Sequence, residues 1–356
     1  MTRPIAAPVL ELRPDELAEA GWASAPCATT AERAAASPDR FLAPDHPFLR
    51  EGTWRAFVAR EGSASVRVVA SLDPRQRVDG AAIGSVGFVA LRGDVRAARR
   101  PLRATLAAAE AWLSANRAAV VRCPVQFSTW FGHRVMTHGL PAAGGPPLFP
   151  MEPPPTPHLA SVLETRGYGV AHTAGSYRVD VGRWIAGTRR GEDRLRASGF
   201  RDRPVDVERL DDELRAVHAI SVASFTASWG FAPIGFAEFA SIYRPLLALL
   251  DPGFVRILDT PGGEPVGFVF AFPDGRTDGD AAPRFVVKTA AVLPEVRRAV
   301  PGVGMGLTVA VHRLAVARGC RVALHACVAD GAYSQRVSAR WGDRIRTYAT
   351  YEKVLR

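Results

Sequence analysis

The stretch RFVVKTAAVLPEVRRAVPGVGMGLTVAVHRLAVARGCRVALHACV, residues 284–328, decides the fold. It begins with an apolar segment, Arg284–Val292, which predicts a buried strand. A glycine-rich turn, Pro294–Gly306, follows, and Leu307–Arg318 predicts a helix. A second apolar segment, Arg321–Val328, predicts another strand. The unit is therefore strand, glycine-rich turn, helix and strand.

The turn of this unit is suited to binding an anion. Gly302, Gly304 and Gly306 let the backbone come close to a ligand. Amides in the first turn of a helix have no intrahelical partner, and the helix dipole adds partial positive charge there. Arg297 and Arg298 add charge-assisted contacts. The turn predicts a pyrophosphate cradle, although a GxG at a helix start also occurs in turns that only pack closely.

Two other phosphate-binding motifs do not match this region. A dinucleotide-binding unit needs GxGxxG and an acidic residue about 20 residues further on. The sequence has Gly319 and Cys320 there instead of an acid. A Walker loop needs GKS or GKT, which the turn lacks.

The same order of elements occurs in the first half of the chain. Ala82–Leu91 predicts a strand, Leu102–Asn116 a helix and Ala119–Val125 a second strand. The turn Arg92–Pro101 lies between strand and helix and has no GxG. The two halves also close alike, with a helix-end glycine followed by an aromatic strand, at Thr165–Asp180 and Ala339–Lys353. We interpret this order as an internal duplication of one α/β unit.

A charged stretch, Gly187–Pro204, is poor in apolar periodicity and predicts a flexible boundary between the halves. We therefore expect two domains, 1–190 and 200–356, of which only the second carries the glycine loop. The proline- and glycine-rich segment Gly139–Pro157 predicts irregular chain within the first domain.

Composition excludes several classes of protein. The 356 residues are 47% hydrophobic and 22% charged, which is typical of a globular chain and excludes wholesale disorder. The apolar stretches are shorter than the roughly 18–20 residues of a membrane span, and the N-terminus lacks the pattern of a secretion signal. The four cysteines form no CxxC and the eight histidines no metal motif. We expect a cytoplasmic protein with reduced thiols, no membrane partner and no metal site.

The chain is basic, with 45 Lys+Arg against 35 Asp+Glu and a net charge of +10. No run of basic residues with interleaved aromatics is present, so the sequence gives little support for a nucleic-acid partner. An anionic small molecule satisfies the same charge, and so does a merely basic surface.

The pattern strand, VxPxxRR, GxG, helix, strand resembles the acyl-CoA loop of the GNAT acetyltransferase superfamily. Val222–Pro233, followed by Phe239, and Pro265–Asp274 are similar to bacterial tandem GNAT proteins whose front unit has lost its glycine loop. The resemblance has specific motifs from about Val205 to Arg356 and extends over Phe41–Asp180 by order of elements. It implies an α/β fold of two tandem GNAT-like units, each a mixed, mostly antiparallel sheet flanked by helices.

The resemblance also implies a co-substrate, acetyl-CoA or another acyl-CoA, whose pyrophosphate the loop amides hold. It makes the backbone amides of Val292 and Leu293 the expected donors to the developing oxyanion. The expected co-substrate site is Val292, Leu293, Arg297, Arg298, Gly302, Val303, Gly304, Met305, Gly306 and Leu307.

The chain departs from the family at several positions. The spacing from Arg298 to Gly302 is one residue longer than in the family, and Pro301 lies inside the loop. The family places Asn after the fifth strand and, seven residues on, a Tyr that protonates the leaving thiolate. The matching positions here are Gly331 and Ser338, so the usual general acid is missing.

Four residues are candidates for proton transfer. His325 lies in an apolar strand beside the expected acceptor entry and is either the base or a core histidine. Asp330 is either a base acting through water or a turn residue. Ser338 occupies the position of the missing general acid, and Tyr333 or a water could substitute for it.

Four more residues are candidates for binding the acceptor. Trp229 and Phe231 either line its pocket or belong to the core. Lys288 either contacts a substrate carboxylate or packs its stem while its amine reaches solvent. Asp274 either caps a turn or binds the acceptor amine.

The expected activity is direct transfer of an acyl group from acyl-CoA to an amine of a small molecule, in a ternary complex and without a covalent enzyme intermediate. One alternative is a catalytically weak acyl-CoA-binding sensor or scaffold, motivated by the missing Tyr. Another is a ligase-like tandem GNAT transferase with a larger donor, as in mycothiol synthase or aminoacyl-tRNA-dependent peptidyl transferases. An oligomer is possible, and the sequence does not identify the acceptor.

Overall fold

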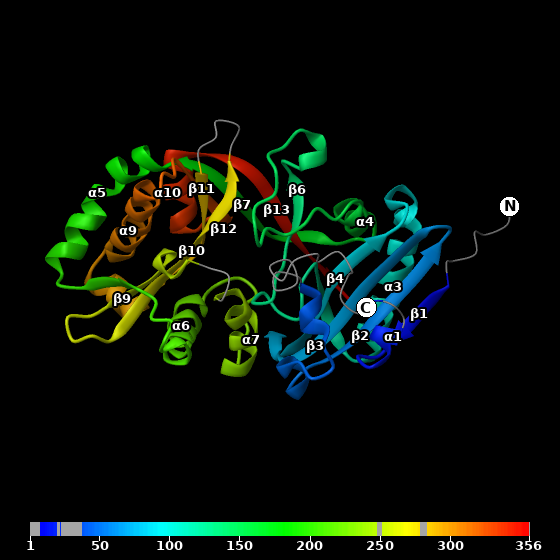
Figure 1. The fold of residues 1–356 in the computed structure, drawn as a ribbon. Helices are drawn as coiled ribbons and strands as arrows, with labels where there is room; N and C mark the ends of the chain where they lie inside the picture. Colours follow the sequence, from blue (N-terminus) through cyan, green and yellow to red (C-terminus); the bar gives the residue numbers. More distant parts are fainter. Residues whose placement is uncertain (1–7, 20–21, 23–37, 248–250, 278–282, 356) are drawn as a thin grey trace.

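The computed structural model describes residues 8–19, 22, 38–247, 251–277 and 283–355. One sheet of thirteen described strands runs through both halves of the chain (Figure 1). The strands follow the order β1-β2-β3-β4-β5-β13-β7-β12-β11-β10-β9-β8, and β6 pairs with β13 beside this path.

The elements of the first half are β1 (Val9–Leu12), α1 (Glu16–Glu19), β2 (Thr53–Glu61), β3 (Ala64–Val78), β4 (Ala81–Arg92), α3 (Arg99–Ala115), β5 (Ala118–Cys123), β6 (Val135–His138), α4 (Leu159–Thr165) and β7 (Gly169–Asp180). Short 3₁₀ turns η1 to η4 lie at Pro38–Leu42, Pro47–Arg50, Val95–Ala98 and Pro141–Ala143.

Helix α5 (Val181–Ala197) leads into the second half. Its elements are β8 (Arg201–Pro204), α6 (Leu210–Phe225), α7 (Phe236–Leu247), η5 (Pro252–Phe254), β9 (Val255–Asp259), β10 (Pro265–Thr277), β11 (Pro283–Val292), α8 (Pro294–Ala299), α9 (Val303–Ala317), β12 (Val322–Ala329), α10 (Tyr333–Trp341) and β13 (Gly342–Val354). None of the helices in these described ranges is long and apolar enough to cross a membrane.

The predicted α/β class and order of elements are confirmed. In the second half, α5 and α9 pack on one face of the sheet and α6 on the other (Figure 1). Helix α9 begins four residues before the predicted Leu307, at Val303, because Gly302 adopts a φ of 93° and caps it. Gly304 and Gly306 therefore lie inside the helix instead of in the turn.

The two halves exchange their last strands. β7 of the first half pairs antiparallel with β12, and β13 of the second half pairs antiparallel with β5. β7 and β13 also pair with each other, from Val179 opposite Gly342 to Gly169 opposite Glu352. An approximate two-fold axis therefore relates the halves, and each completes its sheet with a strand of the other. The division into 1–190 and 200–356 stays a prediction.

The flexible boundary predicted at Gly187–Pro204 is wrong, because α5 continues through most of it. The buried side of α5 includes Trp184, Gly191 and Leu195. Its contact with α9 is a close backbone approach, in which a Cβ added to Gly306 would lie 2.6 Å from the carbonyl oxygen of Gly191. A packing face made partly of glycine gives no apolar periodicity, so the sequence pattern does not mark this helix.

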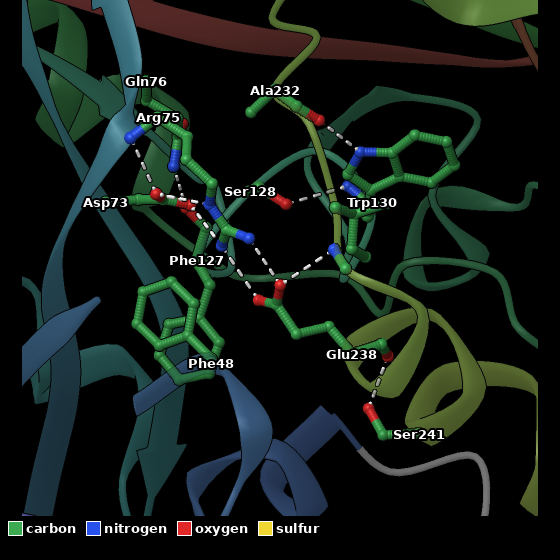
Figure 2. Close-up of polar contacts among 12 residues, drawn as sticks. Phe48, Asp73, Arg75, Gln76, Phe127, Ser128, Trp130, Ala232, Glu238 and Ser241 are labelled. Atoms are coloured by element: carbon green, nitrogen blue, oxygen red, sulfur yellow. Dashed lines mark hydrogen bonds and ion pairs between the residues drawn. The ribbon is translucent and has the colours of Figure 1, made fainter. Parts of the chain in front are cut away.

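An ion-pair network with two buried carboxylates joins β3 of the first half to α7 of the second. Figure 2 shows the Arg75 guanidinium between the carboxylates of Asp73 and Glu238. Arg75 Nη1 lies 2.5 Å from Glu238 Oε2, and Arg75 Nε lies 2.8 Å from Asp73 Oδ1. Beside it, the rings of Phe48 and Phe127 stack with centroids 4.0 Å apart. The ion pair of Arg75 with Glu238 joins the halves, whereas the stacked rings both belong to the first half.

The described cysteines, Cys123, Cys320 and Cys327, are buried free thiols. Cys27 lies outside the described residues.

Candidate functional site

Strands β11 and β12 are parallel neighbours only over their first residues. They pair as far as Val287 and His325 and then separate. Lys288 forms a bulge in β11, since it has no partner in β10. A second bulge lies in β12, where Cys327 has a φ of 51°. Because bulges bend and twist strands, the two strands diverge and leave an opening between them.

This opening belongs to a cavity of about 1390 Å³ that extends between the two halves. The second half lines it from β11, the start of α9, β12 and α10, and the first half from the loop between β5 and β6 and from β7. The predicted residues that line it are Val292, Arg297, Gly302, Gly304, Met305, Leu307, Trp229, Phe231, Lys288, His325, Asp330, Tyr333 and Ser338. The predicted residues that do not line it are Leu293, Arg298, Val303, Gly306 and Asp274.

The two amides predicted as oxyanion donors differ in their surroundings. The Leu293 amide donates to the Val266 carbonyl oxygen at 2.9 Å, so the role predicted for it is wrong. Hydrogen bonding alternates along an antiparallel pair of strands. The preceding residue, Val292, lies opposite Gly267 and therefore turns its amide and carbonyl away from β10. Consistent with this direction, the Val292 carbonyl accepts from Ser224 Oγ at 3.3 Å. The Val292 amide therefore points into the opening.

The start of α9 lies beside this strand edge. A Cβ added to Gly304 would lie 3.3 Å from Val292 Cγ2. The Val303 amide donates to the Val300 carbonyl, whereas no hydrogen bond of the described residues involves the amides of Gly302 or Gly304. Two unpaired amides at a helix start therefore lie in the wall of the cavity, next to the open edge of β11.

Three residues predicted for the co-substrate have other surroundings. Val303 is fully buried in the core, so its side chain packs against the sheet and does not reach the cavity. Gly306 lies against α5, and its missing side chain serves helix packing. Arg298 is exposed outside the cavity, whereas its neighbour Arg297 lines it. Sequence reasoning missed Arg194 of α5, which lines the cavity and donates to the Pro301 carbonyl at 2.9 Å.

A chain of hydrogen bonds runs from Ser338 through two buried histidines. His312 Nδ1 lies 2.7 Å from the Thr308 carbonyl oxygen, which can only accept, so Nδ1 carries the proton. In neutral His312, Nε2 is then an acceptor, and it lies 3.1 Å from His325 Nε2, which must donate. His325 Nδ1 is left to accept from Ser338 Oγ at 2.9 Å.

Both rings are neutral in this arrangement. Burial lowers the pKa of His312 to about 4 and that of His325 well below its usual value, to which His312 contributes further. The Trp184 ring stacks on His312 with centroids 5.1 Å apart. Both nitrogens of His325 have partners, which fits the alternative of a satisfied core histidine. A role for His325 as the base stays a prediction.

The other proton-transfer candidates, Asp330 and Tyr333, line the cavity but differ in burial and in hydrogen-bond partners. Burial raises the pKa of Asp330, but Thr173 and Arg344 outweigh it, so the pKa lies below its usual value. The Arg344 Nη2 atom donates to Asp330 Oδ2 at 3.0 Å. Tyr333, at the start of α10, is 66% exposed and lies at the rim.

Among the acceptor candidates, the role predicted for Asp274 in binding the acceptor amine is wrong. Asp274 lies in a buried ion pair with Arg284, away from the cavity, so it is a structural residue and does not bind the acceptor. Trp229, Phe231 and Lys288 line the cavity, and their contacts with an acceptor stay predictions.

Sequence reasoning missed three residues of the first half that line this cavity. Arg134 and His133 come from the loop between β5 and β6, and His172 comes from β7. The His172 ring stacks on Trp229 of the second half, with centroids 5.0 Å apart and planes 4° apart. No local motif marks them, because the exchange of strands brings them to the second half. Among the described residues, no cluster of three or more His, Cys, Asp or Glu is placed to hold a metal.

No protein-family model and no curated protein matches this sequence. Solved structures match it by fold. A region described as a GCN5-related glucosamine N-acetyltransferase, within a fungal multi-domain GH3 β-N-acetylglucosaminidase, has a TM-score of 0.56 at 13% identity. The match covers 99% of this chain and 38% of that one, so this chain spans well under half of that protein.

Two further structures match over most of this chain. A tandem GNAT protein from the clavulanic acid biosynthesis pathway has a TM-score of 0.50 at 15% identity, covering 98% of both chains. A probable N-acyltransferase from Enterococcus faecalis V583 has a TM-score of 0.55 at 12% identity, covering 98% of this chain and 72% of that one. At these identities the likeness shows the fold alone. The duplicated units, the diverging strands and these matches together show that the chain has the tandem GNAT fold predicted from its sequence.

Proposed function

We propose that this protein transfers an acyl group from an acyl-CoA to the amine of a small molecule, directly and in a ternary complex. One observation carries the proposal: the open edge of β11 and the unpaired amides of Gly302 and Gly304 line the same cavity. A strand edge can pair with an extended amide-bearing chain, and a helix start binds phosphate. Acyl-CoA has both groups, and it would supply the activated thioester.

The residues fit such a co-substrate. Gly302 and Gly304 would hold its pyrophosphate, and Arg297 and Arg194 add positive charge to the same wall. The Val292 amide, directed into the opening, would stabilise negative charge on the thioester oxygen. A solved region described as a glucosamine N-acetyltransferase and a solved structure described as a probable N-acyltransferase share the fold, and they support this choice of donor.

The proposal assigns the proton transfers to groups on the cavity wall. Asp330 would take a proton from the acceptor ammonium through water, since its carboxylate is ionised beside Arg344. Tyr333 or a water would return a proton to the leaving thiolate, because the Ser338 hydroxyl donates its one proton to His325 Nδ1. The buried free thiols fit a cytoplasmic location, which is part of the proposal.

Neighbouring arginines test the co-substrate site. R297A should weaken acetyl-CoA binding about tenfold, ~1.4 kcal/mol, because it removes a charge-assisted phosphate contact. R298A is the matched control, since Arg298 has the same charge but lies outside the cavity, and its affinity should stay within about twofold. Titration calorimetry with acetyl-CoA and with longer acyl-CoAs measures both. Equal effects of the two variants, or no binding of any acyl-CoA, would contradict the proposal.

A sensor or scaffold remains the second candidate, because Ser338 stands where the family has its general acid. Thiol release from acetyl-CoA with a panel of amines separates the two functions. An enzyme releases thiol only when an acceptor is present, whereas a sensor binds acyl-CoA and releases none with any amine.

A further inference from the structure

The cavity holds an arginine without an acidic partner. Arg134 lines it from the loop before β6. Its Nε atom is buried and unpartnered, and no ion pair or hydrogen bond among the described residues involves its guanidinium. Burial lowers the pKa of Arg134, as expected for a cation held away from bulk water. Such a cation costs free energy unless an anion binds it.

A second cation without an ion pair lines the same cavity. The side-chain ammonium of Lys288, in the bulge of β11, makes no hydrogen bond or ion pair within the part of the chain that the structure describes. Burial lowers the pKa of His133, and the charges of Arg134 and Lys288 lower it further. The charges of both cations therefore act on His133.

The acidic side chains of this cavity cannot neutralise Arg134, because arginines already bind them. The pairs are Asp39 with Arg67 at 2.6 Å, Glu152 with Arg346 at 3.1 Å and Asp330 with Arg344 at 3.0 Å. The charge left unpaired around His133 is therefore positive.

The backbone holds Arg134 in an unusual conformation. Its φ is 101°, which a residue with a side chain rarely adopts. Pairing fixes the chain on both sides, since His133 bridges to Val125 and Val135 pairs with Ala349 of β13. Such outliers cost free energy and persist where the surrounding structure imposes them, often at functional sites.

We propose that Arg134, with Lys288, binds an oxyanion of the acceptor, so that the acceptor is an amine that also carries a carboxylate or a phosphate. A guanidinium binds either group through two parallel hydrogen bonds. The stacked pair of His172 and Trp229 lines the same cavity. Calling the ligand an acceptor rests on the proposed function, whereas the anion site itself does not need acyl-CoA.

Pairs of amines that differ only in the anion test this site. The pairs are L-phenylalanine with phenethylamine, L-lysine with cadaverine, and phosphoethanolamine with ethanolamine. Saturation-transfer NMR on the full chain compares the wild type with R134M and R134K. Arg336, exposed on α10 and outside the cavity, gives the control R336M.

The wild type should bind the anionic member of at least one pair at least tenfold more tightly. R134M should lose that preference, R134K should keep part of it, and R336M should keep all of it. In thiol-release assays with acetyl-CoA, R134M should raise the KM of the anionic acceptor at least tenfold and change kcat less. The carboxylate and phosphate pairs decide which oxyanion binds.

The outcomes separate the two proposals. Equal binding of both members of every pair to the wild type would overturn the anion site, whether or not acyl groups are transferred. An anionic preference that R134M loses, in a chain that transfers no acyl group, would support the site and contradict the proposed function. A preference that survives in R134M, or that R336M loses equally, would overturn the role of Arg134.

Discussion

Glu238 is the second-half member of the charge network between β3 and α7, and E238Q should destabilise the protein by about 3 kcal/mol. The carboxylate accepts from Arg75 Nη1 at 2.5 Å and Nη2 at 2.9 Å, and from the Gly235 amide at 3.2 Å (Figure 2). Glutamine keeps one acceptor oxygen and turns an amide donor toward the guanidinium. Both charge-assisted bonds therefore weaken or break.

The magnitude follows from burial. The Glu238 side chain is 6% exposed, and a hydrogen bond to a charged group contributes about 1.5–3 kcal/mol. Losing two such bonds would cost about 3–6 kcal/mol, and Asp73, which still neutralises Arg75, reduces the cost toward the lower end, about 3 kcal/mol. An exposed pair offers the contrast: Arg209 and Asp212 are 70% and 66% exposed, so D212N should cost at most about 0.5 kcal/mol.

Urea unfolding of the full chain, followed by tryptophan fluorescence, measures both variants. A double-mutant cycle with R75M isolates the pair, because removing Arg75 should make the second change at Glu238 much less costly. If E238Q lies within about 1 kcal/mol of the wild type, or costs no more than D212N, the network does not hold the halves as argued.

Two further predictions concern packing and pH. G306A should destabilise the protein by about 1–3 kcal/mol, because the added Cβ would lie 2.6 Å from atoms of α5. G304A should change stability by no more than about 1 kcal/mol, since the nearest neighbour of its Cβ lies at 3.3 Å. Urea unfolding compares the two variants, and equal costs would contradict the packing argument. Burial lowers the pKa of His46 and His312 from 6.5 to about 4, so the unfolded chain binds protons that the folded chain does not. The stability that each buried ring contributes should therefore be full above pH 6.5 and fall as the pH drops toward 4. The loss should be about 2 kcal/mol per histidine between pH 7 and pH 5. H46N should remove the part of this loss that comes from His46, and a flat profile would contradict the burial of these rings.

Local signals predicted the elements of the fold but not their exchange. The apolar segments around the glycine turn became β11, α9 and β12, because a short range of sequence contains the whole unit. The exchange of β7 and β13 depends on pairing between residues far apart in the sequence, such as Gly169 and Glu352, and no local sequence pattern predicts such pairing. Helix α5 was missed for a different reason, since Gly191 in its contact face interrupts the apolar period.

The candidate site divides in the same way. Positions near the turn, such as Arg297 and Gly304, line the cavity because the turn itself forms part of its wall. Arg134 was missed because long-range pairing of β6 with β13 brings it there. Position alone left two alternatives for His325. Its strand was predicted, but its partner His312 depends on how α9 packs over β12.

The exchange of β7 and β13 between the halves is the arrangement that two identical subunits form when they swap terminal strands around a two-fold axis. A gene fusion that joined such a dimer through a helix like α5 would produce this chain. Fusion fixes the ratio of the former subunits at one to one and frees each from the sequence of the other. The first half could then lose its glycine loop and supply residues such as Arg134 to the cavity lining of the second half.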